Sequence, residues 1–311
     1  MTQYILNRII SAIIVIFGIS ILSFFLIHLI PGDPVKIMLG LNASPEQVAK
    51  LTHHLGLDKP LLVQYLQYIN NVFHGDFGTS LKTGRPVLTE ILDRFPETIK
   101  LAATGMVFAV IIGIALGILA AKYKDTIIDT FCTGLATLGV SIPSFWLGIL
   151  LILVFSVKLS WFPIADGTGF RSLILPAITL GVVMSTMISR LTRNGMVEVL
   201  SNDFIRTARS KGLEERHILF RHAFRNVLIP IITVIGLQIA ALLGGTVIIE
   251  QVFNWPGLGT LSIGAIMSRD FPMIQGTVLF MGAVYVSVNI LVDIVYSLID
   301  PRVKLNEKGE G

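Results

Sequence analysis

Between two apolar spans, the chain carries the polar and basic stretch SNDFIRTARSKGLEERHILFRHAFRN, which comprises residues 201–226. Apolar residues still recur in it at helical spacing: Phe204, Ile205, Ala208, Leu213, Ile218 and Leu219. We therefore expect two short helices there, separated at Gly212. Because Ala208 and Gly212 carry little or no side chain, they are expected to leave a bare spot where the backbone of another protein approaches closely. The stretch is typical of an ordered docking loop on one side of a membrane.

The composition is that of an integral membrane protein. Hydrophobic residues make up 53% of the 311 residues and charged residues only 14%, with a mean hydropathy of +0.77, whereas soluble domains carry about a quarter charged residues. A helix needs about 20 residues to cross a bilayer, and six apolar stretches are long enough: 9–30, 99–121, 131–156, 173–194, 228–250 and 277–299. We expect an all-α fold with six transmembrane helices. The first stretch is too long for a cleaved signal and has no small-x-small cleavage site, so it should be a retained span.

The distribution of Lys and Arg predicts that both termini are cytoplasmic. With the N-terminus inside, fourteen of the 24 basic residues fall on the cytoplasmic side. The two short outer loops then hold only Lys158, Arg171 and Arg269. The net charge of +4 follows from this asymmetry. The expected partner of the chain's surface is therefore a lipid bilayer and no nucleic acid.

The sequence divides into four parts. We expect a first span at 1–30, an extracytoplasmic helical insertion at 31–98, a membrane core at 95–300 that includes the cytoplasmic loop 195–227, and a cytoplasmic tail at 301–311. The insertion is too regularly patterned to be a disordered linker. Ser44 and Gln47 have the spacing of a helix capping box around Pro45. Pro60 is expected to open a second helix and Pro86 a third, short one.

Several residues inside the spans are candidates for breaks, contacts or a path. Pro143 should kink the third span, with Ser141 or a neighbouring helix satisfying the freed backbone group. Gln238 in the fifth span is expected either to line a path or to join two helices. Close contacts between helices are expected at small residues, among them Gly105, Gly113 and Gly117.

The sequence lacks the common motifs of nucleotide binding and hydrolysis. No Gly-x4-Gly-Lys-Ser/Thr phosphate loop occurs, so the chain is not expected to bind ATP in that way. Neither His-Glu-x-x-His nor Gly-x-Ser-x-Gly occurs. His53 and His54 are adjacent and would point about 100° apart on a helix, which makes them a poor pair of metal ligands. We expect no catalytic residue, no metal site and no cofactor on this chain.

Short motifs follow one another along the whole chain in a specific order. They are PGDP at 31–34, LGLDKP at 55–60, GDFGTS at 75–80, SIPSF at 141–145, EQVFNWPGLG at 250–259 and DPR at 300–302. Together with residues 201–226 they resemble the permeases of ATP-binding-cassette (ABC) importers for dipeptides, oligopeptides, glutathione and nickel, of the first-subunit type. The docking loop of such permeases carries a Glu-Ala-Ala triplet before a Gly. Here Arg206-Thr207-Ala208 occupies the triplet and Gly212 follows, as in the peptide and nickel branch.

The resemblance implies the type I importer permease fold, with the permease core at 95–300, in the plasma or inner membrane of a bacterium or archaeon. It also implies four partners: a second homologous permease, two nucleotide-binding subunits that bind ATP and Mg, and an extracytoplasmic solute-binding protein. Coupling to the ATPase is implied for Asp203, Phe204, Arg206, Thr207, Ala208, Arg209, Lys211, Gly212, Leu213 and Glu215. The extracytoplasmic motif comprises Gly32, Asp33, Asp76, Phe77 and Gly78.

Alternatives remain for the cargo and for the class of protein. A di- or oligopeptide is the expected solute, with nickel, a metal chelate or glutathione as alternatives. An ion-coupled secondary transporter would need ionisable groups in several spans, whereas Asp293 is the only clear acid in the middle of a span. A membrane enzyme would need a nucleophile or a metal cluster. The outer insertion either guides the released solute at the pore mouth or braces the two permeases.

Overall fold

A computed structural model describes residues 2–26, 34–39, 44–54, 56–164 and 169–299. Within these ranges the chain is helical, and its only strand-like pairing is an isolated bridge between Thr79 and Pro86. The all-α fold expected from the composition is therefore confirmed. Gly32 and Asp33, two residues of the predicted extracytoplasmic motif, lie outside the described residues.

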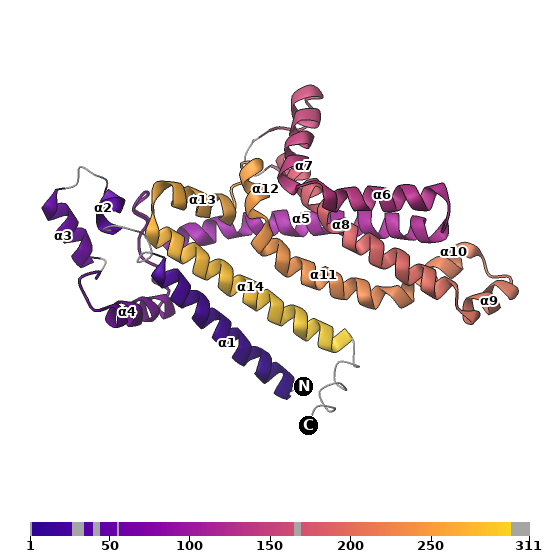
Figure 1. Ribbon diagram of the computed structural model, residues 1–311, viewed down its shortest axis with the longest axis horizontal. Helices are drawn as coiled ribbons and strands as arrows, with labels where there is room; N and C mark the ends of the chain where they lie inside the picture. The colour runs from indigo at the N-terminus through magenta and orange to yellow at the C-terminus, as the bar shows by residue number, and fades with distance from the viewer. Residues whose placement is uncertain (1, 27–33, 40–43, 55, 165–168, 300–311) are drawn as a thin grey trace. The chain divides into compact units, whose positions relative to one another are not determined.

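The helices are labelled in chain order in Figure 1. Their bounds are α1 Thr2–Phe25, α2 Pro34–Leu39, α3 Pro45–His54, α4 Leu61–Phe73, α5 Val87–Lys122, α6 Ile127–Ser141, α7 Ser144–Leu151, the π-helix η1 Ile152–Lys158, α8 Phe170–Leu200, α9 Asp203–Ser210, α10 Glu215–His217, the π-helix η2 Ile218–Phe224, α11 Arg225–Gly245, α12 Val247–Val252, α13 Leu258–Ser268 and α14 Phe271–Ile299.

Six spans can be recognised if one bent pair of helices counts as a single span. Five segments are long and apolar enough to cross a membrane: Arg8–Phe25, Val87–Lys122, Phe170–Leu200, Glu215–Leu242 and Phe271–Ile294. The sixth is formed by Ile127–Ser141 and Ser144–Lys158, which are bent by 105° at the break between them. This number agrees with the six spans expected from the hydropathy of the sequence.

At two prolines the helices differ from those expected from the sequence. Pro143 does not merely kink the third span, since α6 ends at Ser141 and α7 starts afresh at Ser144. Pro96, in contrast, lies inside the continuous helix α5, so the short helix expected at Pro86 and the second span are one element. The loss of one backbone hydrogen bond at a proline is tolerated here because the first turns of α5 are held by packing, with Val87 and Ile91 fully buried.

The chain consists of two compact units, residues 1–98 with 256–290, and residues 99–255 with 291–311. In the first unit, Val87 and Ile91 of α5 form a hydrophobic cluster with Leu258, Ala265 and Met273. The helices α13 and α14 therefore supply part of the core on which the expected insertion rests. The proposed limits of the insertion, 31–98, cover only one part of this unit.

Local signals in the insertion act as the sequence predicts. The amide of Gln47 donates to Ser44 Oγ at 3.2 Å, and the Ser44 amide donates to Gln47 Oε1 at 2.9 Å. This reciprocal pair is the expected capping box at the start of α3. Helix α4 begins after Pro60, and it contacts α1 through a hydrogen bond of 2.9 Å between the hydroxyls of Tyr65 and Ser20.

Helix α8 is the central element of the second unit. Helices α6 and α11 pack along it (Figure 1), and α5 approaches it closely at its glycines. A Cβ atom added at Gly113 would lie 2.7 Å from Ile188, and one added at Gly117 would lie 2.5 Å from Thr192. A Cβ at Gly105 would lie 3.0 Å from Leu180. The close helix contacts expected at these glycines are confirmed.

Gly117→Ala is expected to destabilise the second unit by about 1–3 kcal/mol, since the added methyl group would overpack the interface of α5 and α8. It would lie 2.5 Å from Thr192 Cβ and 2.7 Å from the carbonyl oxygen of Ser189. Gly134→Ala in α6 is the matched control, because nothing lies within 4 Å of a Cβ added there. Thermal unfolding of the purified chain in detergent compares the two, and equal midpoints would contradict the tight packing.

Candidate functional site

The stretch 201–226 forms an ordered loop, which we call the docking loop, between α8 and α11. It contains the short helix α9, a turn at Gly212, α10 and the π-helix η2 (Figure 1). Ile205, Ala208 and Ile218 form a hydrophobic cluster, against which Leu200 of α8 packs. Ile205 and Ile218 are fully buried. The docking loop therefore has a small core that continues from the end of α8.

The position of Ala208 differs from the expected bare spot. Ala208 is 8% exposed and faces the interior of the docking loop, because it shares one face of α9 with Ile205 three residues earlier. A small residue is required there for packing inside this chain. Only Gly212 is left as an open position, since nothing lies within 4 Å of a Cβ added to it.

The docking loop has two arms, α9 before Gly212 and α10 with η2 after it. Gly212 sets the direction of the chain between them. Its φ of +77° is in the left-handed region, which favours glycine. Its amide donates to the Arg209 carbonyl at 2.9 Å, and the Leu213 amide donates to the Ala208 carbonyl at 3.3 Å. These bonds end α9 with a left-handed glycine, a common way to close a helix.

An ion pair joins the two arms across this turn. Arg209 Nη2 donates to Glu215 Oε1 at 2.8 Å, and Arg209 Nε donates to Glu215 Oε2 at 3.2 Å. The hydrogen bonds that the Arg209 guanidinium donates to the Glu215 carboxylate raise the pKa of Arg209. The pair of Arg206 and Asp203 at 3.6 Å is almost fully exposed, so it adds little to stability. Of the predicted coupling residues, Arg209 and Glu215 therefore shape the docking loop.

The outward side of the docking loop combines apolar and basic groups. Phe204 is 46% exposed and Leu213 is 39% exposed, although both could have been expected to pack inward from their helical spacing. Arg206, Thr207 and Lys211 are also exposed. Aromatic and Arg side chains are enriched at protein–protein interfaces, so Phe204 and Arg206 fit such a surface. The structure thus brings Phe204, Thr207 and Lys211 to solvent, and turns Ala208 away from it.

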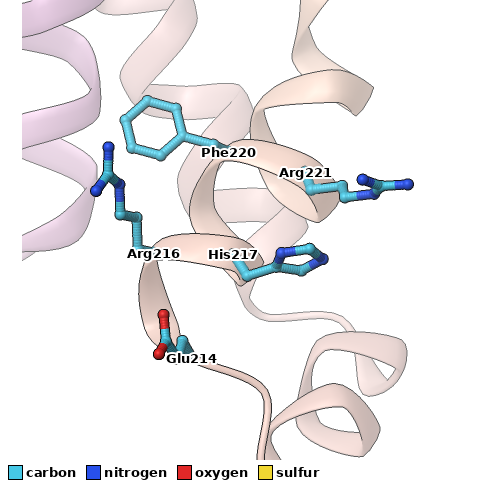
Figure 2. Close-up of a pocket in the computed structure, with 5 residues that line it drawn as sticks. All are labelled: Glu214, Arg216, His217, Phe220 and Arg221. Atoms are coloured by element: carbon cyan, nitrogen blue, oxygen red, sulfur yellow. The ribbon is translucent and has the colours of Figure 1, made fainter.

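A shallow hollow of about 350 Å³ lies beside the second arm, lined by Glu214, Arg216, His217, Phe220 and Arg221. In Figure 2, Arg216 and Phe220 point to one side of the helix, whereas His217 and Arg221 point to the other. The polar groups that line the hollow therefore do not converge on one point, and the hollow lacks the geometry of a small-molecule site.

The motif GDFGTS at residues 75–80 builds a turn inside the first unit. The Gly78 amide donates to Asp76 Oδ1 at 2.9 Å, and Gly78 has a φ of +82°. Phe77 packs against the hydrophobic cluster that contains Val87. Ser80 Oγ donates to the buried carboxylate of Asp270 at 2.5 Å. These contacts show how the motif holds the start of α5 to the start of α14.

The other predicted pathway residues lie in different environments. The Ser141 hydroxyl donates to the Thr137 carbonyl of its own helix at 3.0 Å, just before the break at Pro143. A neighbouring helix also supplies a donor, since Thr186 Oγ1 binds the Ala136 carbonyl at 2.6 Å. Gln238 is buried in α11, and its Oε1 accepts no hydrogen bond from the part of the chain that the structure describes.

Candidate metal ligands are not gathered in the described ranges. Among those residues, no group of three or more His, Cys, Asp and Glu side chains is placed to hold a metal ion. Cys132 is buried in α6 as a free thiol. The rings of His217 and His222 lie 5.5 Å apart in the docking loop, and two imidazoles alone are fewer than the ligands of a structural or catalytic zinc site.

A helical chain with several candidate membrane spans, one of them broken, and an ordered helical loop between α8 and α11 is consistent with a membrane permease. Comparison with known proteins agrees with this class. Residues 113–305 match the family described as binding-protein-dependent transport system inner membrane component, and residues 1–102 match the N-terminal region described for such membrane components. The chain belongs to this family, and is an inner-membrane permease of an ABC importer.

Curated relatives extend over almost the entire chain. A Brucella abortus protein named as a peptide transport system permease is 46% identical over 312 residues, covering 98% of this chain and 99% of the relative. The glutathione transport system permease protein GsiC of Salmonella paratyphi A is 41% identical over 304 residues, again covering 98% and 99%.

Solved structures agree with the fold. The chain is similar to one in the inward-facing MetNI methionine ABC transporter, with a TM-score of 0.55, 18% identity, and coverage of 68% of this chain and 96% of that chain. An amino acid ABC transporter crystallised with histidines gives a TM-score of 0.52 at 16% identity, covering 69% and 94%. The type I importer permease fold expected from the sequence is thus confirmed.

Proposed function

We propose that this chain forms half of the translocation pathway of an ATP-driven importer for di- or oligopeptides, with glutathione as the alternative cargo. The observation that carries this proposal is the full-length similarity to permeases named for peptide and for glutathione transport, at 46% and 41% identity. Glutathione is itself a tripeptide, so both names indicate short peptides. Nickel or a metal chelate stays the weaker alternative.

The partners follow from the family and from the docking loop. A second homologous permease would complete the pathway, an extracytoplasmic binding protein would deliver the solute, and two ATPase subunits would bind ATP and Mg. The loop supports an ATPase partner because it has a small hydrophobic core of its own and exposes the aromatic ring of Phe204. Phe204 and Gly212 are proposed to meet the ATPase directly, whereas Ala208, Arg209 and Glu215 hold the loop in shape.

ATP-dependent uptake tests the proposed function. The complete complex, reconstituted in proteoliposomes with its binding protein, should import a labelled dipeptide only when ATP is supplied on the ATPase side. Uptake driven by an ion gradient without the ATPase subunits would instead indicate a secondary transporter. Import of glutathione or of nickel but of no other peptide would reassign the cargo within the same class of importer.

Both termini are proposed to be cytoplasmic, with residues 31–98 on the outer side. A cysteine placed at Lys50 should react with a membrane-impermeant reagent in intact cells, whereas one at Lys211 should react only after the cells are opened. Both positions are exposed, and the Cys132→Ser background removes the native thiol. Labelling of position 211 in intact cells would show that the chain has the opposite orientation in the membrane.

We infer that the outer insertion braces the protein, and that its GDFGTS motif does not contact the solute. Asp76 and Phe77 both make contacts inside the first unit. Phe77→Ala should therefore lower the amount of assembled complex and the uptake in the same proportion, since truncating a partly buried Phe costs up to about 3–5 kcal/mol. Normal assembly with reduced uptake would favour the alternative, in which the motif guides the solute.

A further inference from the structure

A further ion pair lies about two helical turns before the docking loop, between α6 and α8 of the second unit. Arg193 of α8 binds Asp129 of α6 with two hydrogen bonds, Nε to Oδ1 and Nη2 to Oδ2, each 2.6 Å long. The side chain of Asp129 is 7% exposed and that of Arg193 is 25% exposed. Such two-point pairing of a guanidinium with a carboxylate fixes both the distance and the orientation of the two groups.

The carboxylate of Asp129 is saturated with donors. In addition to Arg193, the backbone amide of Asp125 donates to Oδ2 at 3.0 Å, and Thr133 Oγ1 donates to Oδ1 at 3.2 Å. Asp129 therefore ties together the turn that precedes α6, the first turns of α6 and the final part of α8. The two bonds from Arg193 connect α6 to α8, and the bonds from Asp125 and Thr133 hold the carboxylate in the orientation that these two require.

The contact continues along the two helices. The Thr186 hydroxyl of α8 donates to the Ala136 carbonyl of α6 at 2.6 Å. A Cβ added at Gly139 would lie only 2.8 Å from the Val182 carbonyl oxygen. Thus α6 is attached to α8 from its first turn to its last, and the ion pair is the attachment nearest the docking loop.

The position of Arg193 relates this pair to the docking loop. Arg193 is seven residues before Leu200, where α8 ends, which is about two turns of helix. Leu200 packs against the small core of the docking loop. A displacement of that loop would be transmitted directly to the end of α8. The other end of α6 leads through the break at Pro143 into α7 and η1, which complete the third span.

We propose that the Asp129–Arg193 pair is a mechanical joint which makes the broken third span move together with α8 when the docking loop is displaced. Asp129 and Arg193 are positioning residues, since they would act through the helices that they connect. This role rests on the proposed coupling to an ATPase. Elements that are packed and ion-paired move as rigid bodies in such transitions, so loss of the joint would allow α8 to move while α6 lags behind.

The test is the number of solute molecules imported per ATP hydrolysed by the complete complex in proteoliposomes. Asp129→Asn keeps the size of the side chain and removes its charge. It should leave ATP hydrolysis within about twofold of the wild type and lower the import per ATP by about tenfold, within the range by which internal contacts modulate coupling. The double variant Asp129→Arg/Arg193→Asp reverses the pair and should recover a substantial part of that loss.

An exposed ion pair supplies the control. Arg85 and Asp93 lie 2.8 Å apart with more than half of each side chain exposed, so Arg85→Gln should leave import per ATP unchanged. Unchanged import per ATP in Asp129→Asn would overturn the proposal. So would a parallel fall in assembly, hydrolysis and uptake that charge reversal does not repair, since that result would show a structural role alone.

A milder variant keeps the test decisive if Asp129→Asn fails to assemble. Thr133→Val removes a single donor to the carboxylate and should lower import per ATP by about twofold, with normal hydrolysis. An unchanged ratio in that variant would also count against the joint. Failure of the wild-type complex to import any solute with ATP would instead refute the proposed function, and is therefore distinguishable from failure of the joint.

Discussion

Gly212→Trp should leave the chain folded in the membrane and abolish its association with the ATPase subunits. Nothing lies within 4 Å of a Cβ added at Gly212, so a side chain attached there would start in open space. The φ of +77° would cost a non-glycine residue about 1–3 kcal/mol. The larger effect is expected in the complex, because the indole would occupy the space that the proposed ATPase surface must fill.

Gly84→Trp is the matched control for this variant. Gly84 lies in the proposed outer insertion, has a φ of +70°, and likewise has nothing within 4 Å of an added Cβ. Both variants therefore carry a similar backbone strain and a similar exposed indole. Co-purification of the ATPase is measured for both variants. A loss of ATPase with Gly212→Trp alone would show that docking, and not backbone strain, is affected. Wild-type yields of ATPase with Gly212→Trp would refute the docking role of this turn.

Phe204→Ala should weaken the complex with the ATPase by about 2–4 kcal/mol, the range for an anchoring residue at the centre of an interface. Phe204 is the large apolar side chain that α9 presents to solvent, at 46% exposure. Its neighbours on α9, Ile205 and Ala208, are used in the core of the docking loop. Removal of the ring should therefore spare the fold of the loop and affect binding alone.

Phe145→Ala in α7 provides the comparison, since Phe145 is also 46% exposed but lies outside the docking loop. Titration of the purified ATPase onto the permease complex should give a clearly weaker affinity for Phe204→Ala and an unchanged one for Phe145→Ala. Equal affinities for the two variants would show that the docking surface does not include Phe204 of α9. A loss of helix content in Phe204→Ala would point to an unexpected structural role of the ring.

Features that depend on neighbouring residues in the sequence could be predicted. The apolar stretches predicted the six spans that the structure has when the bent pair counts as one, because crossing a bilayer requires a continuous run of apolar side chains whatever their partners are. The capping box of Ser44 and Gln47 formed as expected, since both hydrogen bonds join residues three apart. The docking loop, too, was recognisable from its helical pattern and from Gly212, whose left-handed φ is a local property of the turn.

Other features arise only when distant segments meet. Helical spacing groups Ile205 and Ala208 on one face of α9, but only contact with Ile218 decides that this face is buried and that Phe204 is left outside. Pro96 continues a helix because the cluster around Val87 and Ile91 holds its first turns.

The pairing of charges shows most clearly that contacts between distant segments cannot be predicted from the sequence. Asp129 and Arg193 are 64 residues apart in the chain, and neither belongs to a sequence motif from which its partner could be predicted. Their bidentate contact exists because α6 and α8 pack side by side, and that packing depends on the small residues and hydroxyls along both helices. Hydropathy and local spacing thus define which segments enter the membrane and where they turn. The choice of partners between helices is decided by complementary shape, which emerges only in the packed structure.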